Sequence, residues 1–248
     1  MEQKPAENPG HEPQERSKPE ERLREHERAY RFTLARFEQH VLPKMAATLP
    51  GWVRPDHMTA LGVLASVGIG LSYWLTVRHP AWLWVASALL VVQWYGDSLD
   101  GTLARYRRIE RPRYGYYLDH LVDSFSTFAV GLGLGLSPYM LLSVGLAIVI
   151  GYLVLSINVY LETHVYGEFS FGYGYMGPTE IRVILLALNM TALVVGPFRF
   201  ELLGLDVTIF DVAGVLAFLG MLALLLVRVN GNLRRLASLE PPGVVRGE

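Results

Sequence analysis

The chain has 248 residues, of which 51% are hydrophobic and 18% are charged, and it contains no cysteine. The lack of cysteine excludes a disulfide framework, a thiolate metal site and a cysteine nucleophile. A net charge of -1 argues against a nucleic-acid-binding protein, because such a protein presents a basic face to its partner. We therefore expect no nucleic acid partner.

Charged residues are concentrated at the start of the chain. Residues 1–28 hold 14 of the 45 charged side chains and four prolines. This composition is too polar to bury a core, so residues 1–28 are predicted to form a disordered, charged cytoplasmic tail. The rest of the chain is poor enough in charge to indicate a membrane protein.

Residues 29–50 carry an amphipathic pattern. Tyr30, Leu34, Phe37 and Val41 recur at helical spacing, whereas charged residues lie off that stripe. The pattern predicts a juxtamembrane amphipathic helix that lies in the membrane interface. A helix packed on the protein's own cytoplasmic face is an equal alternative.

Uncharged runs predict six transmembrane helices, because a helix needs roughly 20 mostly apolar residues to cross the hydrocarbon core. The runs cover residues 58–77, 81–96, 124–161, 183–198 and 212–227. The longest run exceeds one ordinary span and contains Ser137 and Pro138, so we predict two helices joined there, with the first starting near Tyr114. The fold is thus predicted to be all-α and polytopic, with a transmembrane domain over residues 51–236 and a cytoplasmic tail over 237–248.

Arginines follow the second and the sixth predicted span, and such a bias sets the orientation of a membrane protein. They are Arg105, Arg107, Arg108, Arg111, Arg113, Arg228, Arg234 and Arg235. The loops at the other ends of the spans are poor in positive charge. Both termini are therefore expected in the cytoplasm. No signal peptide is predicted, since the first apolar run begins at residue 58.

Four carboxylates lie at the cytoplasmic ends of the second and third predicted spans. Asp97 and Asp100 end the second helix at spacing i, i+3, and Asp119 and Asp123 lie in the third at spacing i, i+4. Each pair therefore shares one helix face. The short arginine-rich connection predicts an antiparallel hairpin that brings both pairs to one depth. Acidic groups are costly in a membrane, so these four are candidates for function.

Facing carboxylates repel one another, and divalent cations remove that repulsion. Oxygen ligands without histidine or cysteine favour magnesium, manganese or calcium over zinc. The alternative is a salt-bridge network in which the neighbouring arginines neutralise the acids. Gly101, Ala104 and Gly115 lie in register with the acids and leave room for a ligand, and Arg105 adds a charge suited to phosphate. A diphosphate that bridges two metals is the ligand that best fits the acids, the small residues and Arg105 together. The alternative for the small residues is close helix packing.

The order of these residues resembles a family signature. The chain reads Asp-x-x-Asp-Gly-x-x-Ala-Arg from Asp97 to Arg105, then nine residues, then Gly-x-x-x-Asp-x-x-x-Asp from Gly115 to Asp123. This pattern is similar to that of the CDP-alcohol phosphotransferases, which are membrane enzymes of phospholipid synthesis with six transmembrane helices. Pro-Asp-His-Met-Thr near the start of the first span resembles the family's Pro-Asn-x-x-Thr, with Asp56 in place of the usual asparagine.

The resemblance implies roles for these residues. Metal ligands would be Asp97, Asp100, Asp119 and Asp123, holding two Mg²⁺ or Mn²⁺ ions, and Asp123 would also be the general base. The cytidine diphosphate part would be held by Thr59, Gly101, Ala104, Arg105 and Gly115. The expected reaction transfers a substituted phosphate from a CDP-linked donor to an alcohol hydroxyl and releases CMP. The resemblance also implies a homodimer and a cytoplasmic active site.

The substrate is expected to depend on residues 162–182. Glu162 and Glu180 are similar to residues in the same region of choline and ethanolamine phosphotransferases, whereas Arg182 suits an acceptor with a phosphate. The aromatic residues between them suit a cationic head group or an interfacial aromatic belt. The donor therefore stays open between CDP-diacylglycerol and a CDP-aminoalcohol. An intramembrane prenyltransferase and a cation transporter are the alternatives from other classes, and CMP production distinguishes them.

Overall fold

The computed structural model describes residues 34–166, 177–202 and 204–240. These ranges contain seven helices and one two-stranded sheet. The elements are α2 (Ala35–Thr48), α3 (Pro55–Leu75), α4 (Trp82–Arg107), α5 (Pro112–Gly135), α6 (Leu142–Tyr166), α7 (Pro178–Val195), β1 (Arg199–Leu202), β2 (Leu205–Thr208) and α8 (Ile209–Leu239). The prediction of a helical fold is confirmed. The tail predicted over residues 1–28 lies outside the described ranges.

Four helices, α3, α6, α7 and α8, are long and apolar enough to cross a membrane. Helices α4 and α5 have 26 and 24 residues, which is also sufficient length, but they carry the acidic residues of the predicted site. The six-span topology therefore remains a prediction. The expected break at residues 137–138 is confirmed, because α5 ends at Gly135 and α6 begins at Leu142.

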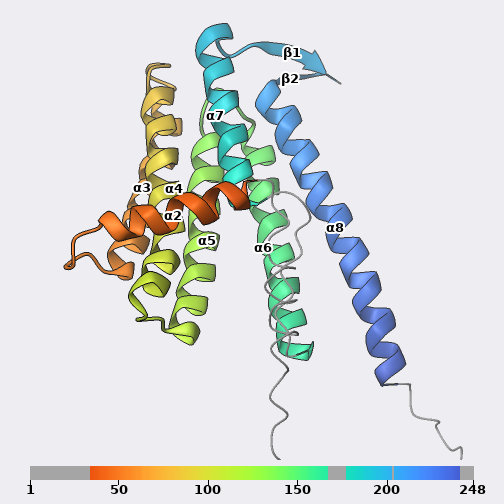
Figure 1. Ribbon diagram of the computed structural model, residues 1–248. Helices are drawn as coiled ribbons and strands as arrows, with labels where there is room; N and C mark the ends of the chain where they lie inside the picture. Colours follow the sequence, from red (N-terminus) through yellow and green to blue (C-terminus); the bar gives the residue numbers. More distant parts are fainter. Residues whose placement is uncertain (1–33, 167–176, 203, 241–248) are drawn as a thin grey trace, which may run out of the picture.

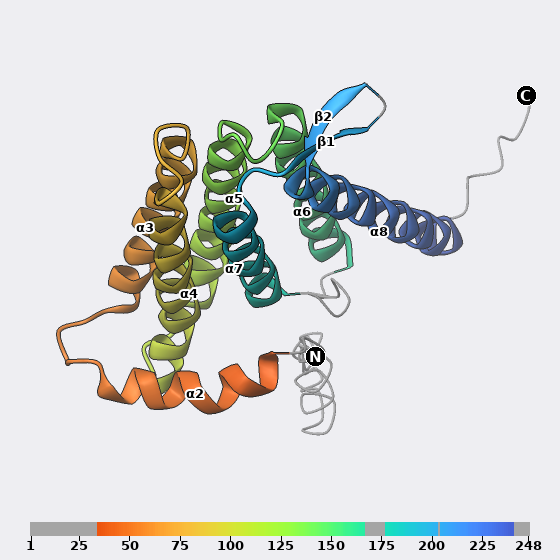
Figure 2. The same ribbon diagram turned by 90° about the horizontal axis from the view of Figure 1, so that it is seen from above.

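The spanning helices run roughly along one direction, and α2 runs across them (Figure 1). Helix α3 packs against both α4 and α5, while α6 packs against α5 and α8. Helix α8 diverges from the other helices (Figure 2). The turn between α4 and α5 lies at the same end of the molecule as the end of α8, and the β1–β2 hairpin lies at the opposite end (Figure 1).

Glycines allow α3 to approach its two neighbours closely. A Cβ atom on Gly96 of α4 would lie 2.7 Å from the backbone nitrogen of Gly62 on α3. A Cβ atom on Gly133 of α5 would lie 2.3 Å from the Cα atom of Gly70, also on α3. Small residues at such crossings are the usual way in which membrane helices gain packing contacts, so α3 is the central helix of the domain.

Polar contacts fix the bundle at two further points. Buried Asn189 of α7 accepts a 3.0 Å hydrogen bond from the Tyr73 hydroxyl on α3 and donates a 3.0 Å bond to Ser87 on α4. Near the hairpin, Asp211 of α8 accepts 2.8 Å and 2.6 Å bonds from the backbone nitrogens of Thr208 and Leu141. These contacts join α3, α4 and α7, and they join the starts of α6 and α8.

Helix α2 occupies part of the predicted range 29–50. Its Leu42 and Ala46 are buried in a cluster with Leu99 and Leu103 of α4, whereas Phe37 is 55% exposed. The contact with α4 supports packing on the protein's own face. Location of α2 in the membrane interface stays a prediction.

Two expectations differ from the structure. Asp97 and Asp100 do not end a helix, because α4 continues through helix-compatible residues to Arg107 and ends where Arg108 takes a left-handed conformation (φ 57°). The connection between the fifth and sixth predicted spans, which is expected to be a loop, contains an antiparallel hairpin in which Arg199 pairs with Thr208. Gly204 in its turn has a φ of 78°, a value that glycine adopts without steric cost.

Candidate active site

The four predicted carboxylates lie on α4 and α5. Asp97 and Asp100 both lie on α4, about one helical turn apart, and Asp119 and Asp123 lie in the same way on α5. On α5, Asp119 and Asp123 offer carboxylate oxygens within 4.8 Å of each other. We call these four carboxylates the acid cluster.

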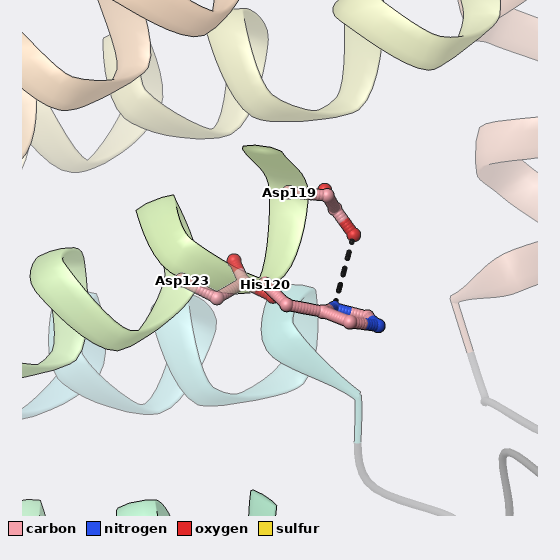
Figure 3. Close-up of side chains that lie close together, drawn as sticks. All are labelled: Asp119, His120 and Asp123. Carbon is pink, nitrogen blue, oxygen red and sulfur yellow. Dashed lines mark ion pairs between the residues drawn. The ribbon is translucent and has the colours of Figure 1, made fainter. Parts of the chain in front are cut away.

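The α5 half of the acid cluster includes a histidine. Asp119, His120 and Asp123 each offer one ligand atom, and these atoms lie within 4.8 Å of one another. The Nδ1 atom of His120 lies 3.6 Å from Oδ2 of Asp119 (Figure 3). The ring of His120 also stacks on Tyr160 of α6, with 5.1 Å between the ring centroids. Two carboxylates and an imidazole can bind a divalent cation, so the donor set fits a metal site.

The α4 half of the acid cluster is oriented by a neighbouring hydroxyl. Thr59 on α3 donates a 2.8 Å hydrogen bond to Oδ2 of Asp100, and the backbone nitrogen of Gly101 donates a 2.5 Å bond to Oδ1. Thr59 is buried. The family resemblance implies that Thr59 holds the nucleotide. In the structure its hydroxyl binds a carboxylate of the acid cluster.

Arg182 of α7 lies against the other carboxylate of α4. Its Nη2 atom donates a 2.5 Å hydrogen bond to Oδ2 of Asp97, and its Nε atom donates a 2.5 Å bond to Oε1 of Gln93. Gln93 was not among the predicted site residues. Its signal in the sequence is a polar side chain within an apolar run, one helical turn before Asp97.

The residues predicted to hold the nucleotide lie beside the acid cluster. Gly101 and Ala104 are half-buried on α4, and Arg105 is exposed and donates a 3.3 Å bond to the Thr102 hydroxyl. Gly115 is exposed on α5, and a Cβ atom there would meet nothing within 4 Å. Space for a ligand therefore exists at Gly115.

Asp56, which stands in the position where the family signature has asparagine, lies at the start of α3. Its carboxylate forms an exposed ion pair with Arg111 in the turn between α4 and α5. Hydrogen bonding to Asp56 raises the pKa of the Arg111 guanidinium. The Asp56 side chain therefore joins the start of α3 to the turn between α4 and α5.

Glu162, Glu180 and Arg182 do not converge. Glu162 on α6 accepts a 2.6 Å bond from Asn232 and pairs with Arg228 at 3.3 Å, and both partners lie on α8. Glu180 accepts bonds from the backbone nitrogens of Gly177 and Leu34 at 3.0 and 2.9 Å. The aromatic residues of 167–176, which belong to the same predicted region, lie outside the described residues.

A groove of about 650 Å³ lies between α5 and α6 beside the acid cluster. Its lining is mainly aromatic and apolar, with several polar tips. The lining residues are Tyr116, Tyr117, His120, Leu121, Ser124, Tyr160, Thr163 and His164. His120 lines the groove and lies within 4.8 Å of the ligand atoms of Asp119 and Asp123, so the groove adjoins the acid cluster. We call this feature the α5–α6 groove.

Comparisons with known proteins cover most of the described chain. The sequence profile of the CDP-alcohol phosphatidyltransferase family matches residues 52–229. An uncharacterized CDP-alcohol phosphatidyltransferase class-I family protein 2 of Dictyostelium discoideum is 27% identical over 69% of this chain and 42% of its own length. Cholinephosphotransferase 1 of Gallus gallus is 28% identical over 68% of this chain and 53% of its own length.

A third relative matches a shorter segment. The phosphatidylinositol phosphate synthase of Cutibacterium acnes is 32% identical over 38% of this chain and 43% of its own length. The chain thus spans about half the length of the curated relatives that it matches. The family profile, in contrast, covers the helices that carry the acid cluster and continues into α8. The chain therefore belongs to the CDP-alcohol phosphatidyltransferase family.

Proposed function

We propose that this protein transfers a substituted phosphate from a CDP-linked donor to the hydroxyl of an alcohol and releases CMP. The observation that carries the proposal is the acid cluster, in which Asp119 and Asp123 lie within 4.8 Å of each other on α5 and two further carboxylates lie on α4. Such a concentration of acids in a membrane domain is costly unless cations compensate it. Membership of the family supports the same reaction.

Two divalent cations, Mg²⁺ or Mn²⁺, would be held by Asp97, Asp100, Asp119 and Asp123. His120 is an additional candidate ligand, because its ring lies next to Asp119. When bound, the cations would supply positive charge to the phosphoryl oxygens. Thr59 keeps the Asp100 carboxylate in one orientation, and this lowers the conformational freedom that a ligand would otherwise have to remove.

Asp123 is the proposed general base. It lies one turn after Asp119 on α5, and the next residue, Ser124, lines the α5–α6 groove. A hydroxyl at this end of the groove would be positioned to lose its proton to the Asp123 carboxylate as it attacks phosphorus. Arg105 and the open space at Gly115 would hold the cytidine diphosphate part of the donor.

We further propose that the alcohol is a lipid, such as diacylglycerol, and that the donor is a CDP-aminoalcohol. The α5–α6 groove supports this choice, because its lining is mostly apolar and includes no lysine or arginine among the described residues. An acceptor with its own phosphate would need such a cation. Arg182, the predicted partner of that phosphate, donates to Asp97 instead. The similarity to a cholinephosphotransferase supports the same donor class.

The proposed topology has six spans, with the acid cluster and both termini in the cytoplasm. The arginine-rich turn between α4 and α5 lies at the same end of the molecule as the end of α8 (Figure 1), where further arginines occur. Positive charge at one end of the bundle supports a cytoplasmic location for that end. The donor, which is water-soluble, would then arrive from the cytoplasm, whereas a lipid acceptor would arrive through the bilayer.

The experiment that tests this function follows CMP release by the purified protein. CDP-choline and CDP-ethanolamine are each supplied with diacylglycerol, and CDP-diacylglycerol is supplied with glycerol phosphate, inositol phosphate or serine. We expect CMP from a CDP-aminoalcohol and diacylglycerol, its loss in EDTA and its recovery with Mg²⁺ or Mn²⁺. If CMP is released only when CDP-diacylglycerol is the donor, the proposed substrates are wrong. If activity is full in EDTA, the proposed role of the metals is wrong. No CMP from any pair would overturn the reaction itself.

A further inference from the structure

The guanidinium of Arg182 is held by two groups of α4. Its Nε atom donates a 2.5 Å hydrogen bond to Gln93, and its Nη2 atom donates a 2.5 Å bond to Asp97. The side chains of Arg182 and Asp97 are only 11% and 17% exposed. A mostly buried ion pair persists only with good geometry and additional hydrogen bonds. Gln93, which is itself buried, provides such a hydrogen bond.

Gln93 holds the guanidinium of Arg182 in place without cancelling its positive charge. Gln93 and Asp97 are one helical turn apart and therefore lie on the same face of α4. A glutamine accepts a hydrogen bond without neutralising the guanidinium, so the full positive charge is left for the acids. The Nη2 atom of Arg182 contacts Asp97 directly, so Arg182 is a counter-ion to one carboxylate of the acid cluster.

The helix that carries Arg182 is also fixed in place. Thr179 in the first turn of α7 donates a 2.6 Å hydrogen bond to Oε1 of Glu38 on α2. The same oxygen accepts a 2.8 Å bond from the indole of Trp94, which is next to Gln93 on α4. Glu38 therefore joins the start of α7 to α4. This bridge fixes the end of α7 from which Arg182 reaches Asp97.

We propose that Arg182, oriented by Gln93, is a resident counter-ion that offsets one negative charge of the acid cluster in the metal-free protein and competes with divalent cations for Asp97. The inference rests on the proposed function, in which the same acids bind the metals. It assigns a positioning role to Gln93, which lies outside the family signature, and it moves Arg182 from the acceptor to the metal side of the site. Its physical basis is that a cation in contact with a carboxylate lowers the affinity of that carboxylate for any other cation.

The test measures Mn²⁺ binding to the full chain in detergent by isothermal titration calorimetry, in the absence of substrate. Arg182→Gln should bind Mn²⁺ about 10-fold more tightly than the wild type, by analogy with the effect of a contacting cation on the proton affinity of a carboxylate. Gln93→Met should give a smaller change of the same sign, about threefold, because the guanidinium stays but is no longer oriented. Arg182→Lys keeps the charge but loses the fork that reaches both Gln93 and Asp97, so it should change the affinity about as much as Gln93→Met does.

Arg228→Gln is the matched control. Arg228 forms an ion pair with Glu162 in which the side chains are 14% and 11% exposed, but the pair joins α6 to α8 rather than the acid cluster. Its loss should lower thermal stability without changing the Mn²⁺ affinity. Unchanged or weaker Mn²⁺ binding in both Arg182→Gln and Gln93→Met would overturn the counter-ion role.

The outcomes for the inference and for the proposed function are distinguishable. A wild type that binds no Mn²⁺ would overturn both the metal sites and the counter-ion. A wild type that binds Mn²⁺ and releases CMP, with variants that do not bind Mn²⁺ more tightly, would overturn the counter-ion alone. If Arg182→Gln does not fold, Gln93→Met decides the question, since it removes no charge.

Discussion

The hydroxyl of Thr59 on α3 donates a 2.8 Å hydrogen bond to the Asp100 carboxylate on α4. This contact joins the central helix of the domain to the acid cluster, and Thr59 is buried where it forms. Because the acceptor is charged, the bond is stronger than one between neutral groups. The position of Asp100 therefore depends on a side chain that lies 41 residues earlier in the sequence.

Thr59→Val should weaken binding of Mn²⁺ and of CDP by about 10-fold, since a hydrogen bond to a charged group contributes roughly 1.5 to 3 kcal/mol. Calorimetric titration of each ligand measures the change. Thr191→Val is the matched control, because the Thr191 hydroxyl is exposed and, within the described part of the chain, donates to the carbonyl of Ala187 on its own helix. If Thr59→Val binds Mn²⁺ and CDP as tightly as the wild type, the hydrogen bond between Thr59 and Asp100 contributes to the binding of neither ligand.

Asp123→Asn should abolish turnover while much of the CDP affinity remains, because a base acts only as the acceptor hydroxyl loses its proton. Asp97→Asn and Asp100→Asn should weaken metal and nucleotide binding together. CMP release and CDP titration, measured on the same preparations, separate the two effects. Equal losses of CDP affinity in all three variants would make Asp123 chiefly a metal ligand.

Much of the site follows from the sequence, because spacing along a helix determines which residues share a face. The pairs Asp97 with Asp100 and Asp119 with Asp123 could be predicted in this way, and the ligand atoms of Asp119 and Asp123 lie within 4.8 Å of each other. The break between α5 and α6 could also be predicted from the position of Pro138. These features depend on local periodicity and on the cost of acids in a membrane.

Contacts between distant helices could not be predicted in the same way. Arg182 reaches Asp97 across 85 residues of sequence, and Glu162 turns toward α8 rather than toward the acid cluster. The direction of a side chain depends on how its helix is rotated against its neighbours, and a stretch that is apolar all round gives little signal of that rotation. His120 lies between Asp119 and Asp123 in the sequence and could be expected to face a neighbouring helix, but its stacking on Tyr160 of α6 could not be predicted for the same reason.

Gly115→Val should fold normally but bind CDP more weakly, by about 10-fold or more, because its side chain would occupy space that the ligand needs. A Cβ atom at this position meets nothing within 4 Å in the protein itself. Thermal unfolding in detergent tests the first expectation, and CDP titration tests the second. Wild-type CDP affinity in this variant would place the nucleotide elsewhere.

Glu162→Gln should lower stability by about 3 kcal/mol, because it removes the negative charge from a mostly buried ion pair. The remaining charge is that of Arg228, which is 14% exposed. The substitution should change the KM of neither substrate by more than about twofold, since Glu162 faces α8 and not the acid cluster. Thermal unfolding and substrate titrations distinguish these effects. A large rise in the KM of one substrate at unchanged stability would return Glu162 to the head-group site.

Gly133→Ala should destabilise the domain, because its new Cβ atom would lie 2.3 Å from backbone atoms of Gly70 and would force α3 and α5 apart. Overpacking of this kind typically costs about 1 to 3 kcal/mol, and more where the obstructing atoms are backbone and cannot turn aside. Gly220→Ala is the matched control, since a Cβ atom there meets nothing within 4 Å. Thermal unfolding in detergent compares the two variants. The separation of α3 from α5 should also reduce CMP release, because α3 carries Thr59 and α5 carries Asp119 and Asp123. Equal stability of both variants would contradict the close approach of α3 and α5.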